Sequence, residues 1–322
     1  MLKGLMRNLI LLILFLSLAI AADDWTKNKK AIDASIKKHE RALIKISDEI
    51  WHNAELALEE YKSSKILADY AEKNGFSLER GVAGMPTAFI ATYGSGRPRI
   101  GILGEFDANA GISQKAQSTK EALIEGAPGH GCGHNLYGTG SLGAAIAIKE
   151  LIAQGKIKGT IVFYGTPAEE TIFGKVWFAR AGLFNDLDVC MDWHPGDDME
   201  AATQSSKALI DFRVKFSGKA SHASADPWNG FSAVDAMELF TTGINYYREH
   251  IKPTARIHYQ IERAGDVVNV VPENAQIWVR VRENDRESLN VVYERVKKMA
   301  AAGALMAEVD HEVSLISGIY EI

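Results

Sequence analysis

The amino-acid sequence predicts an α/β protein, in which a mostly parallel sheet flanked by helices is followed by an inserted, smaller α/β sandwich. Apolar strand segments alternate with helical segments over the first half of the chain, which is typical of a parallel sheet covered on both faces. Beyond residue 207 the strand segments alternate between apolar and polar side chains, which indicates a sheet with one exposed face. The 322 residues are enough for about two domains at roughly 100–200 residues each.

The first domain is expected over residues 23–206. Apolar residues at three- and four-residue intervals, such as Ile32, Ile36 and Leu43, predict a helix from Trp25 onward. The other elements expected here are helices at 59–73, 140–152 and 174–181 and strands at 87–93, 99–106, 160–164 and 187–192. The last strand contains Cys190, which we interpret as a buried core thiol.

The second domain is expected over residues 207–318, with the boundary near residue 206. The expected elements are strands at 208–216, 256–262, 275–282 and 308–316 and helices at 232–249 and 286–302. Their βαββαβ order describes a small α/β sandwich. In its first strand Asp211, Arg213 and Lys215 share one face, which is expected to be exposed.

The N-terminus has the pattern of a secretory signal peptide over residues 1–22. Lys3 and Arg7 precede an apolar run at 9–22, which contains the small-residue pattern Ala19-Ile20-Ala21 and is followed by two acidic residues. The run is short for a membrane span, which needs about 20 residues. The alternative is an uncleaved signal anchor. In both cases the rest of the chain is expected to leave the cytosol, so the protein is expected to be secreted or periplasmic.

Composition excludes several classes of partner. The net charge of −5 and a pI near 6.0 give no basic surface for nucleic acid. The sequence contains no P-loop, and its glycine-rich stretches lack a dinucleotide-binding fingerprint.

Four segments at strand ends carry metal-binding or acid–base residues: Glu105-Phe106-Asp107, the stretch 130–135, Glu169-Glu170 and Asp192-Trp193-His194. Ligands of open α/β sheets gather at the carboxyl ends of strands, so these segments are expected to converge. Each alone has a structural explanation, for example a helix cap for Asp107 or a solvated surface for the glutamate pair. Their joint occurrence predicts a metal site.

Cys132 and His134 are central to this prediction, because they lie two residues apart within Gly-His-Gly-Cys-Gly-His at 129–134. Thiolate and imidazole both suit zinc or manganese-like ions. An exported protein also permits a disulfide between Cys132 and Cys190, but the neighbours of Cys132 favour a metal ligand.

With these motifs the chain resembles the dinuclear-metal aminoacylase and carboxypeptidase family. It is most similar to the branch of the p-aminobenzoyl-glutamate hydrolase B subunits and the indole-acetyl-amino-acid hydrolases. The matching segments are 103–107, 129–135, 166–170, 192–195, 218–223 and 268–272. The resemblance runs from about Trp51 to the end and implies a metallo-exopeptidase-like catalytic domain with an inserted lid.

The resemblance implies four metal ligands, which are Cys132, His134, Glu170 and His194. It implies Glu169 as the general base that takes a proton from a metal-bound water, which fits general physical principles because a metal lowers the pKa of its water toward about 7. The cofactors implied are two divalent ions per subunit of the complete protein, zinc or manganese.

The second domain resembles the lid through which such enzymes form homodimers. His222 would reach the active site of a partner subunit and stabilise the oxyanion, and Asn269 would line the substrate pocket. Arg280 and Arg282 share one face of a strand, and Arg282 in particular is expected to meet a substrate carboxylate.

The leading hypothesis is a hydrolase that cuts the amide of N-acyl amino acids, such as aminobenzoyl-glutamate-like conjugates. A metallo-dipeptidase acting on short peptides is the alternative. In the family a further segment closes the catalytic sheet and supplies a last metal-binding histidine, which His311, inside the final lid strand, does not match. We therefore expect a C-terminally incomplete chain, and an inactive metal-binding or dimerising remnant is the third interpretation.

Overall fold

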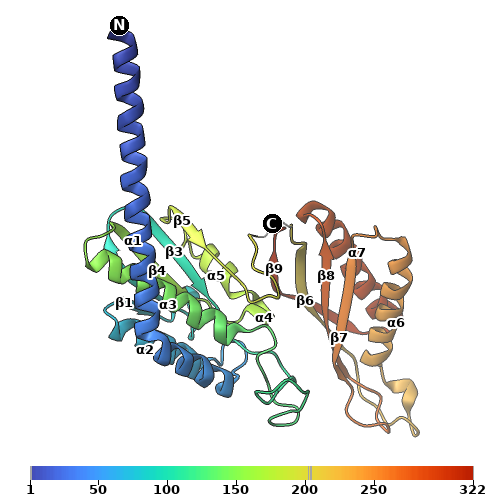
Figure 1. The fold of residues 1–322 in the computed structure, drawn as a ribbon. Helices are drawn as coiled ribbons and strands as arrows, with labels where there is room; N and C mark the ends of the chain where they lie inside the picture. The colour runs from blue at the N-terminus through green and yellow to red at the C-terminus, as the bar shows by residue number, and fades with distance from the viewer. Residues whose placement is uncertain (1, 202, 204, 322) are drawn as a thin grey trace. The chain divides into compact units, whose positions relative to one another are not determined.

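The computed structural model describes residues 2–201, 203 and 205–321, with side chains from Trp25 onward. The chain divides into two compact units, residues 1–199 and 200–322, and each is described by itself (Figure 1). The predicted signal peptide falls at the start of helix α1 (Leu2–Asn53), where the side chains lie outside the described residues. The finer domain limits stay predictions.

Two further long helices belong to unit 1. Helix α2 (Tyr61–Lys73) ends at Asn74 and Gly75, where Gly75 adopts a φ of 88° that favours glycine. Helix α3 (His134–Ala153) begins six residues earlier than expected, because the left-handed Gly133 (φ 74°) caps it. The short elements of this unit are η1 (Val82–Gly84), α4 (Glu169–Ile172) and α5 (Gly174–Arg180).

The sheet of unit 1 is mixed and has the strand order β1-β2-β4-β3-β5. Its strands are β1 (Ser77–Arg80), β2 (Phe89–Ser95), β3 (Arg99–Gly104), β4 (Gly159–Gly165) and β5 (Val189–Met191). Strands β3, β4 and β5 are parallel, and β1 and β2 are antiparallel to their neighbours. The predicted α/β class is therefore confirmed.

Both faces of this sheet are covered by apolar side chains, as the sequence predicts. On one face Phe89 and Phe163 pack with residues of α1, α2 and α3, including Leu67 and Leu142. On the other face Tyr164 packs with Phe178 of α5 and with other apolar residues. The strands of the sheet therefore have buried interiors.

The interpretation of Cys190 as a buried core thiol is wrong. Strand β5 lies at the edge of the sheet, where it pairs with β3 alone. All three of its residues are exposed, and Val189 and Met191 are 50% and 57% exposed. Both Cys190 and Cys132 are free thiols, so the disulfide alternative is not realised.

Unit 2 has the predicted βαββαβ order and an antiparallel sheet ordered β7-β8-β6-β9. Its elements are β6 (Ala208–Ser217), α6 (Ala233–Tyr247), β7 (Arg256–Ala264), β8 (Asn274–Glu283), α7 (Arg286–Met306) and β9 (Asp310–Ile319), with short helices η2 (Pro227–Asn229) and η3 (Arg248–His250). The side chains of Ser232 and Asp285 cap α6 and α7. One sheet face packs Phe212 and Phe216 of β6 against Phe240 of α6 and residues of α7.

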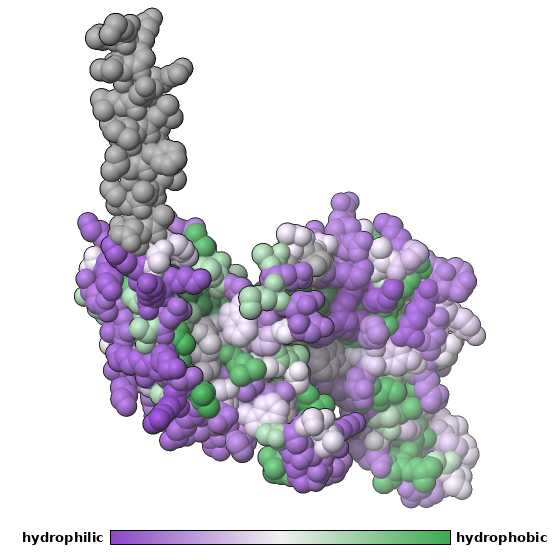
Figure 2. Space-filling model, viewed as in Figure 1, coloured by the Kyte–Doolittle hydropathy of each residue, from purple (hydrophilic) through white to green (hydrophobic). Residues whose placement is uncertain are grey.

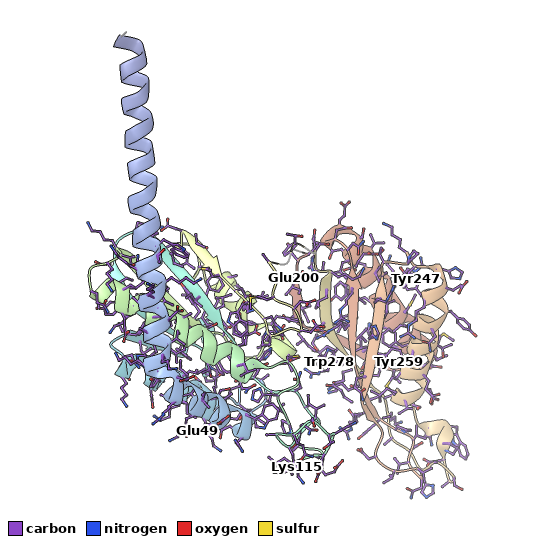
Figure 3. The ribbon with its side chains drawn as sticks, in the orientation of Figure 1. Glu49, Lys115, Glu200, Tyr247, Tyr259 and Trp278 are labelled. Carbon is purple, nitrogen blue, oxygen red and sulfur yellow. The ribbon has the colours of Figure 1, made fainter. Side chains whose placement is uncertain are left out.

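The opposite face of β6 is less open than the sequence predicts. Asp211 is fully buried, because Arg280 of β8 clamps its carboxylate with three nitrogen–oxygen contacts of 2.6–3.0 Å. The indole of Trp278, labelled in Figure 3, donates to Asp211 at 3.2 Å. A polar residue on this face is therefore buried through its partners and not through apolar packing.

Hydrophilic residues cover most of the surface seen in Figure 2, which agrees with the 24% of charged residues in the chain. Among the described residues, no helix combines the length and the apolar character that a membrane crossing requires.

Candidate metal centre

The predicted convergence of strand ends occurs in unit 1. Strands β3, β4 and β5 run parallel, so their carboxyl ends lie at one edge of the sheet. The segments that follow them carry Glu105 and Asp107, then Glu169 and Glu170, then His194, and the first turn of α3 adds His134. Two groups of candidate ligand atoms result, and within each group all atoms lie within 4.8 Å of one another. One group consists of Cys132, His134 and Glu170, and the other of Glu105, His134 and His194.

The glycines of the 129–134 segment allow close backbone approach. A long segment joins β3 to α3, with Lys115 in its outer part (Figure 3). Asn109 and Gly129 close its base through two backbone hydrogen bonds of 2.9 and 3.0 Å. A Cβ atom on Gly129 would lie 2.4 Å from the carbonyl oxygen of Ile112. Only glycine fits there, because a side chain would push the segment away.

Asp107 fixes the orientation of the His134 ring. Its Nδ1 atom lies 2.9 Å from Asp107 Oδ1 and 3.0 Å from the Asp107 carbonyl oxygen, and the ring is almost fully buried. Both partners are acceptors, so Nδ1 is a donor, and Nε2 is the nitrogen left to bind a metal ion once the ion displaces its proton. A carboxylate that holds the far nitrogen of a histidine in this way is the usual support of a metal-ligating imidazole.

Asp107 also fixes the glutamate segment, so its role is larger than that of an isolated helix cap. Its Oδ2 atom accepts a hydrogen bond from the backbone nitrogen of Glu170 at 2.9 Å. One buried carboxylate thus orients both His134 and the start of α4.

The first ligand group fits a metal ion because it contains buried polar atoms that lack hydrogen bonds to the described residues. His134 Nε2 and Glu170 Oε1 are buried, accept or donate no hydrogen bond within the described part of the chain, and lie 4.0 Å apart. Such unsatisfied buried atoms are costly unless something binds them. The pKa of the Cys132 thiol is raised to about 11 by burial, by its hydrogen bond to Glu170 and by the Glu170 charge. The thiol thus holds its proton until a cation displaces it.

The second group contains a residue that our sequence-based ligand set omits. Glu105 is 1% exposed, and its Oε2 atom lies 3.1 Å from His134 Nε2. Its other oxygen forms an ion pair of 2.7 Å with Lys175 of α5. Its sequence signals are its place at the end of a predicted strand and its position in the matching segment 103–107. His194 is exposed, and its Nδ1 donates to the carbonyl oxygen of Pro195 at 2.9 Å, which leaves its Nε2 as the acceptor.

Glu169 has the ionisation expected of a general base. Burial raises its pKa to about 7, assisted by the negative charges of Glu105, Glu170 and Asp107. A base whose pKa lies near the operating pH is the most effective proton acceptor. For His134, burial lowers the pKa, but the hydrogen bond and charge of Asp107 outweigh it and give a value of about 9.

In unit 2 the structure brings two of the predicted site residues together. His222 pairs with Val270 in an antiparallel bridge, and the nitrogen of Ala223 donates to the carbonyl oxygen of Asn269 at 3.0 Å. His222 Nδ1 accepts from the backbone nitrogens of Ser224 and Ala225, both at 3.1 Å. The exposed ring therefore carries its proton on Nε2 and presents it as a donor.

Arg282 is not near this pair. It lies toward the far end of β8, eight residues beyond the start of the strand, which corresponds to roughly 26 Å at about 3.3 Å per residue. Arg280 is engaged with Asp211. Burial, followed by the charge of Arg280, lowers the pKa of Arg282. The substrate-binding roles of Asn269 and Arg282 stay predictions.

Comparison with known proteins relates both units to one family. The profile of the peptidase dimerisation domain matches residues 204–306. The B subunit of p-aminobenzoyl-glutamate hydrolase from Escherichia coli K12 is 40% identical over 279 residues, which cover 86% of this chain and 58% of that protein. The human Xaa-Arg dipeptidase is 31% identical over 281 residues, which cover 81% of this chain and 59% of that protein.

The fold is also similar to that of a dinuclear metal-binding M20 peptidase from Bacillus subtilis. The TM-score is 0.58 at 20% identity, with 88% of this chain and 76% of that chain covered. The chain spans less than two thirds of the length of the two sequence relatives.

Proposed function

Because the chain belongs to the M20 peptidase family, we propose that it specifies a metal-dependent hydrolase of amide bonds in N-acyl amino acids. Conjugates that resemble aminobenzoyl-glutamate are the proposed substrates, since the E. coli relative carries that name. The observation that supports this most is the position of Glu169, a carboxyl with a pKa of about 7, next to two groups of candidate metal ligands.

Cys132, His134, Glu170 and His194 would hold the metal, and a divalent ion bound there would supply Lewis-acid polarisation of the scissile carbonyl. Glu169 takes a proton from the attacking water and later gives it to the departing amine nitrogen. Two metals per subunit, zinc or manganese, are part of the proposal. The mixture of thiolate, imidazole and carboxylate suits either ion.

His222 is proposed to donate its Nε2 hydrogen to the oxyanion that forms during attack. It would do so in the active site of a partner subunit within a homodimer, and the match to a peptidase dimerisation domain supports this. Asn269, held beside His222, would contact the substrate, and Arg282 would bind its carboxylate. Export through the N-terminal signal peptide is proposed from the sequence pattern alone.

The test is Glu169→Ala, assayed for hydrolysis of p-aminobenzoyl-glutamate and for metal content by mass spectrometry. We expect hydrolysis to be lost while the bound metal persists, because Glu169 moves protons and does not hold the ion. The control is Glu125→Ala, which changes an exposed glutamate of the segment between β3 and α3 and should leave both readouts unchanged. Loss of metal together with activity would make Glu169 a ligand and contradict its role as base.

A dipeptidase is the second candidate, and the relative named Xaa-Arg dipeptidase favours it. A panel that pairs acyl-amino acids with dipeptides ending in arginine separates the two functions. Metal binding without turnover on any member would support the third interpretation, a metal-binding or dimerising protein.

A further inference from the structure

Ala168 has an unusual backbone conformation directly before the two glutamates of the metal centre. Its φ of 62° and ψ of 34° lie in the left-handed region, which is costly for a residue with a Cβ atom. The residue is fully buried between the end of β4 and the start of α4. Something in the surrounding structure must therefore hold it there.

Glu60, at the start of α2, makes the contact that can do so. Its Oε1 atom accepts a hydrogen bond from the backbone nitrogen of Ala168 at 2.9 Å, and its Oε2 atom accepts from Thr87 Oγ1 at 2.8 Å. The two residues are 108 positions apart in the sequence. This contact fixes the orientation of the peptide group that precedes the left-handed residue.

The burial of Glu60 argues against a role as an ordinary helix cap. The side chain is 0% exposed, it makes no hydrogen bond that caps α2, and it forms no ion pair with the described residues. Burial raises its pKa to about 7. An acid buried without a cation is expensive, whereas a methionine or leucine would fill the same space without that cost.

Two buried carboxylates thus hold the glutamate segment on either side of Glu169. Glu60 binds the nitrogen of Ala168, and Asp107 binds the nitrogen of Glu170. Glu169 lies between the two anchored backbone nitrogens, and Glu170 carries the second of them. Glu170 lies within reach of the ligand atoms of Cys132 and His134, and the charge of Glu169 acts on both of these side chains.

We propose that Glu60 is a positioning residue, which stabilises the left-handed conformation of Ala168 and thereby directs Glu169 and Glu170 into the metal centre. The proposal rests on the proposed function in so far as Glu170 is taken as a metal ligand. Glu60 itself contacts neither metal nor substrate.

The test measures the Zn²⁺ affinity of the full chain by competition with a chromogenic chelator. Glu60→Met keeps the length of the side chain and removes both acceptors. Loss of a group that orients metal ligands typically weakens binding about 10–100-fold. Glu60 acts through one further residue, so we expect about a tenfold loss. Glu60→Gln keeps an oxygen for the Ala168 nitrogen and should stay within about threefold of the unaltered protein.

The decisive variant is Ala168→Gly, because glycine adopts the left-handed conformation without strain. Alone it should bind zinc as the unaltered protein does. Combined with Glu60→Met it should restore most of the lost affinity, and it should also restore folding if Glu60→Met alone proves insoluble. Glu55→Met is the matched control, since Glu55 binds the nitrogens of Lys62 and Ser63 at the same end of α2 without contacting Ala168.

Two results would overturn the proposal. One is unchanged zinc affinity in a folded Glu60→Met protein. The other is a loss that Ala168→Gly does not reverse or that Glu55→Met reproduces, which would show a general destabilisation of α2. Failure of the unaltered protein to bind zinc would be a different outcome, since it would contradict the proposed function and remove the basis of the present proposal with it.

Discussion

The buried pair of Asp211 and Arg280 offers a sharp test of the energetics of unit 2. Asp211 is fully buried and accepts from Arg280 and Trp278, while the Arg280 side chain keeps 23% of its exposure. Asp211→Ala takes the carboxylate away from a largely desolvated guanidinium. Removing one partner of a buried ion pair costs about 3–5 kcal/mol. The residual hydration of Arg280 favours the lower end, about 3 kcal/mol.

The same sheet provides the matched control. Arg213 and Glu262 also form a pair with several contacts, of 2.9–3.1 Å, but their side chains are 40% and 23% exposed. Exposed pairs contribute about 0–1 kcal/mol, so Glu262→Ala should have a small effect. Urea unfolding followed by tryptophan fluorescence, with Trp278 as a reporter in this unit, measures both variants.

A further variant separates the charge from the shape of the site. Asp211→Leu combined with Arg280→Met should recover most of the stability lost in Asp211→Ala, because neither buried charge remains. Equal losses for Asp211→Ala and Glu262→Ala would refute the assignment of the large effect to burial.

Three other predictions concern unit 1. Burial raises the pKa of Glu60 from an ordinary 4.5 to about 7, so the folded protein binds this proton more tightly than the unfolded chain does. The protonated carboxyl therefore contributes about 3 kcal/mol to the free energy of unfolding below pH 4.5, and this contribution is lost as the pH rises through 7. Glu60→Gln should flatten that part of the slope in urea titrations with EDTA, and an unchanged slope would contradict the raised value. Cys132→Ser should weaken metal retention, and equal metal content in both proteins by mass spectrometry would remove Cys132 from the ligands. Gly165→Ala would place a Cβ atom 2.1 Å from the Phe89 ring and should lower the unfolding free energy by about 1–3 kcal/mol, whereas an unchanged melting temperature would show that the ring moves freely.

Much of the fold could be predicted because local pattern and global position agree. The apolar interiors of β3 and β4 identify buried strands, and the ends of parallel strands must share one edge of a sheet. The same rule predicts that the segments of Glu105, Glu169 and His194 converge. The βαββαβ order of unit 2 followed from alternation and from helical spacing in the same way.

The failures have one physical origin, which is that a local sequence pattern does not show which strand or side chain from a distant part of the chain lies beside a given residue. The segment of Cys190 is as apolar as an inner strand, but β5 lies at the sheet edge. Asp211 occupies a polar position in the alternation, but Arg280 and Trp278 enclose it. Glu60 and Ala168 are 108 residues apart, and no local signal marks either of them.

His134 limits how the metal centre can fill. Its Nδ1 is committed to Asp107, so a single nitrogen faces two groups of ligands that both include it. One lone pair serves one ion at a time. The first ion to take that nitrogen therefore leaves a poorer set for the second, either Cys132 with Glu170 or Glu105 with His194. If two ions bind to the described residues as proposed, only one of them can use His134, and the other would depend on the remaining members of its group.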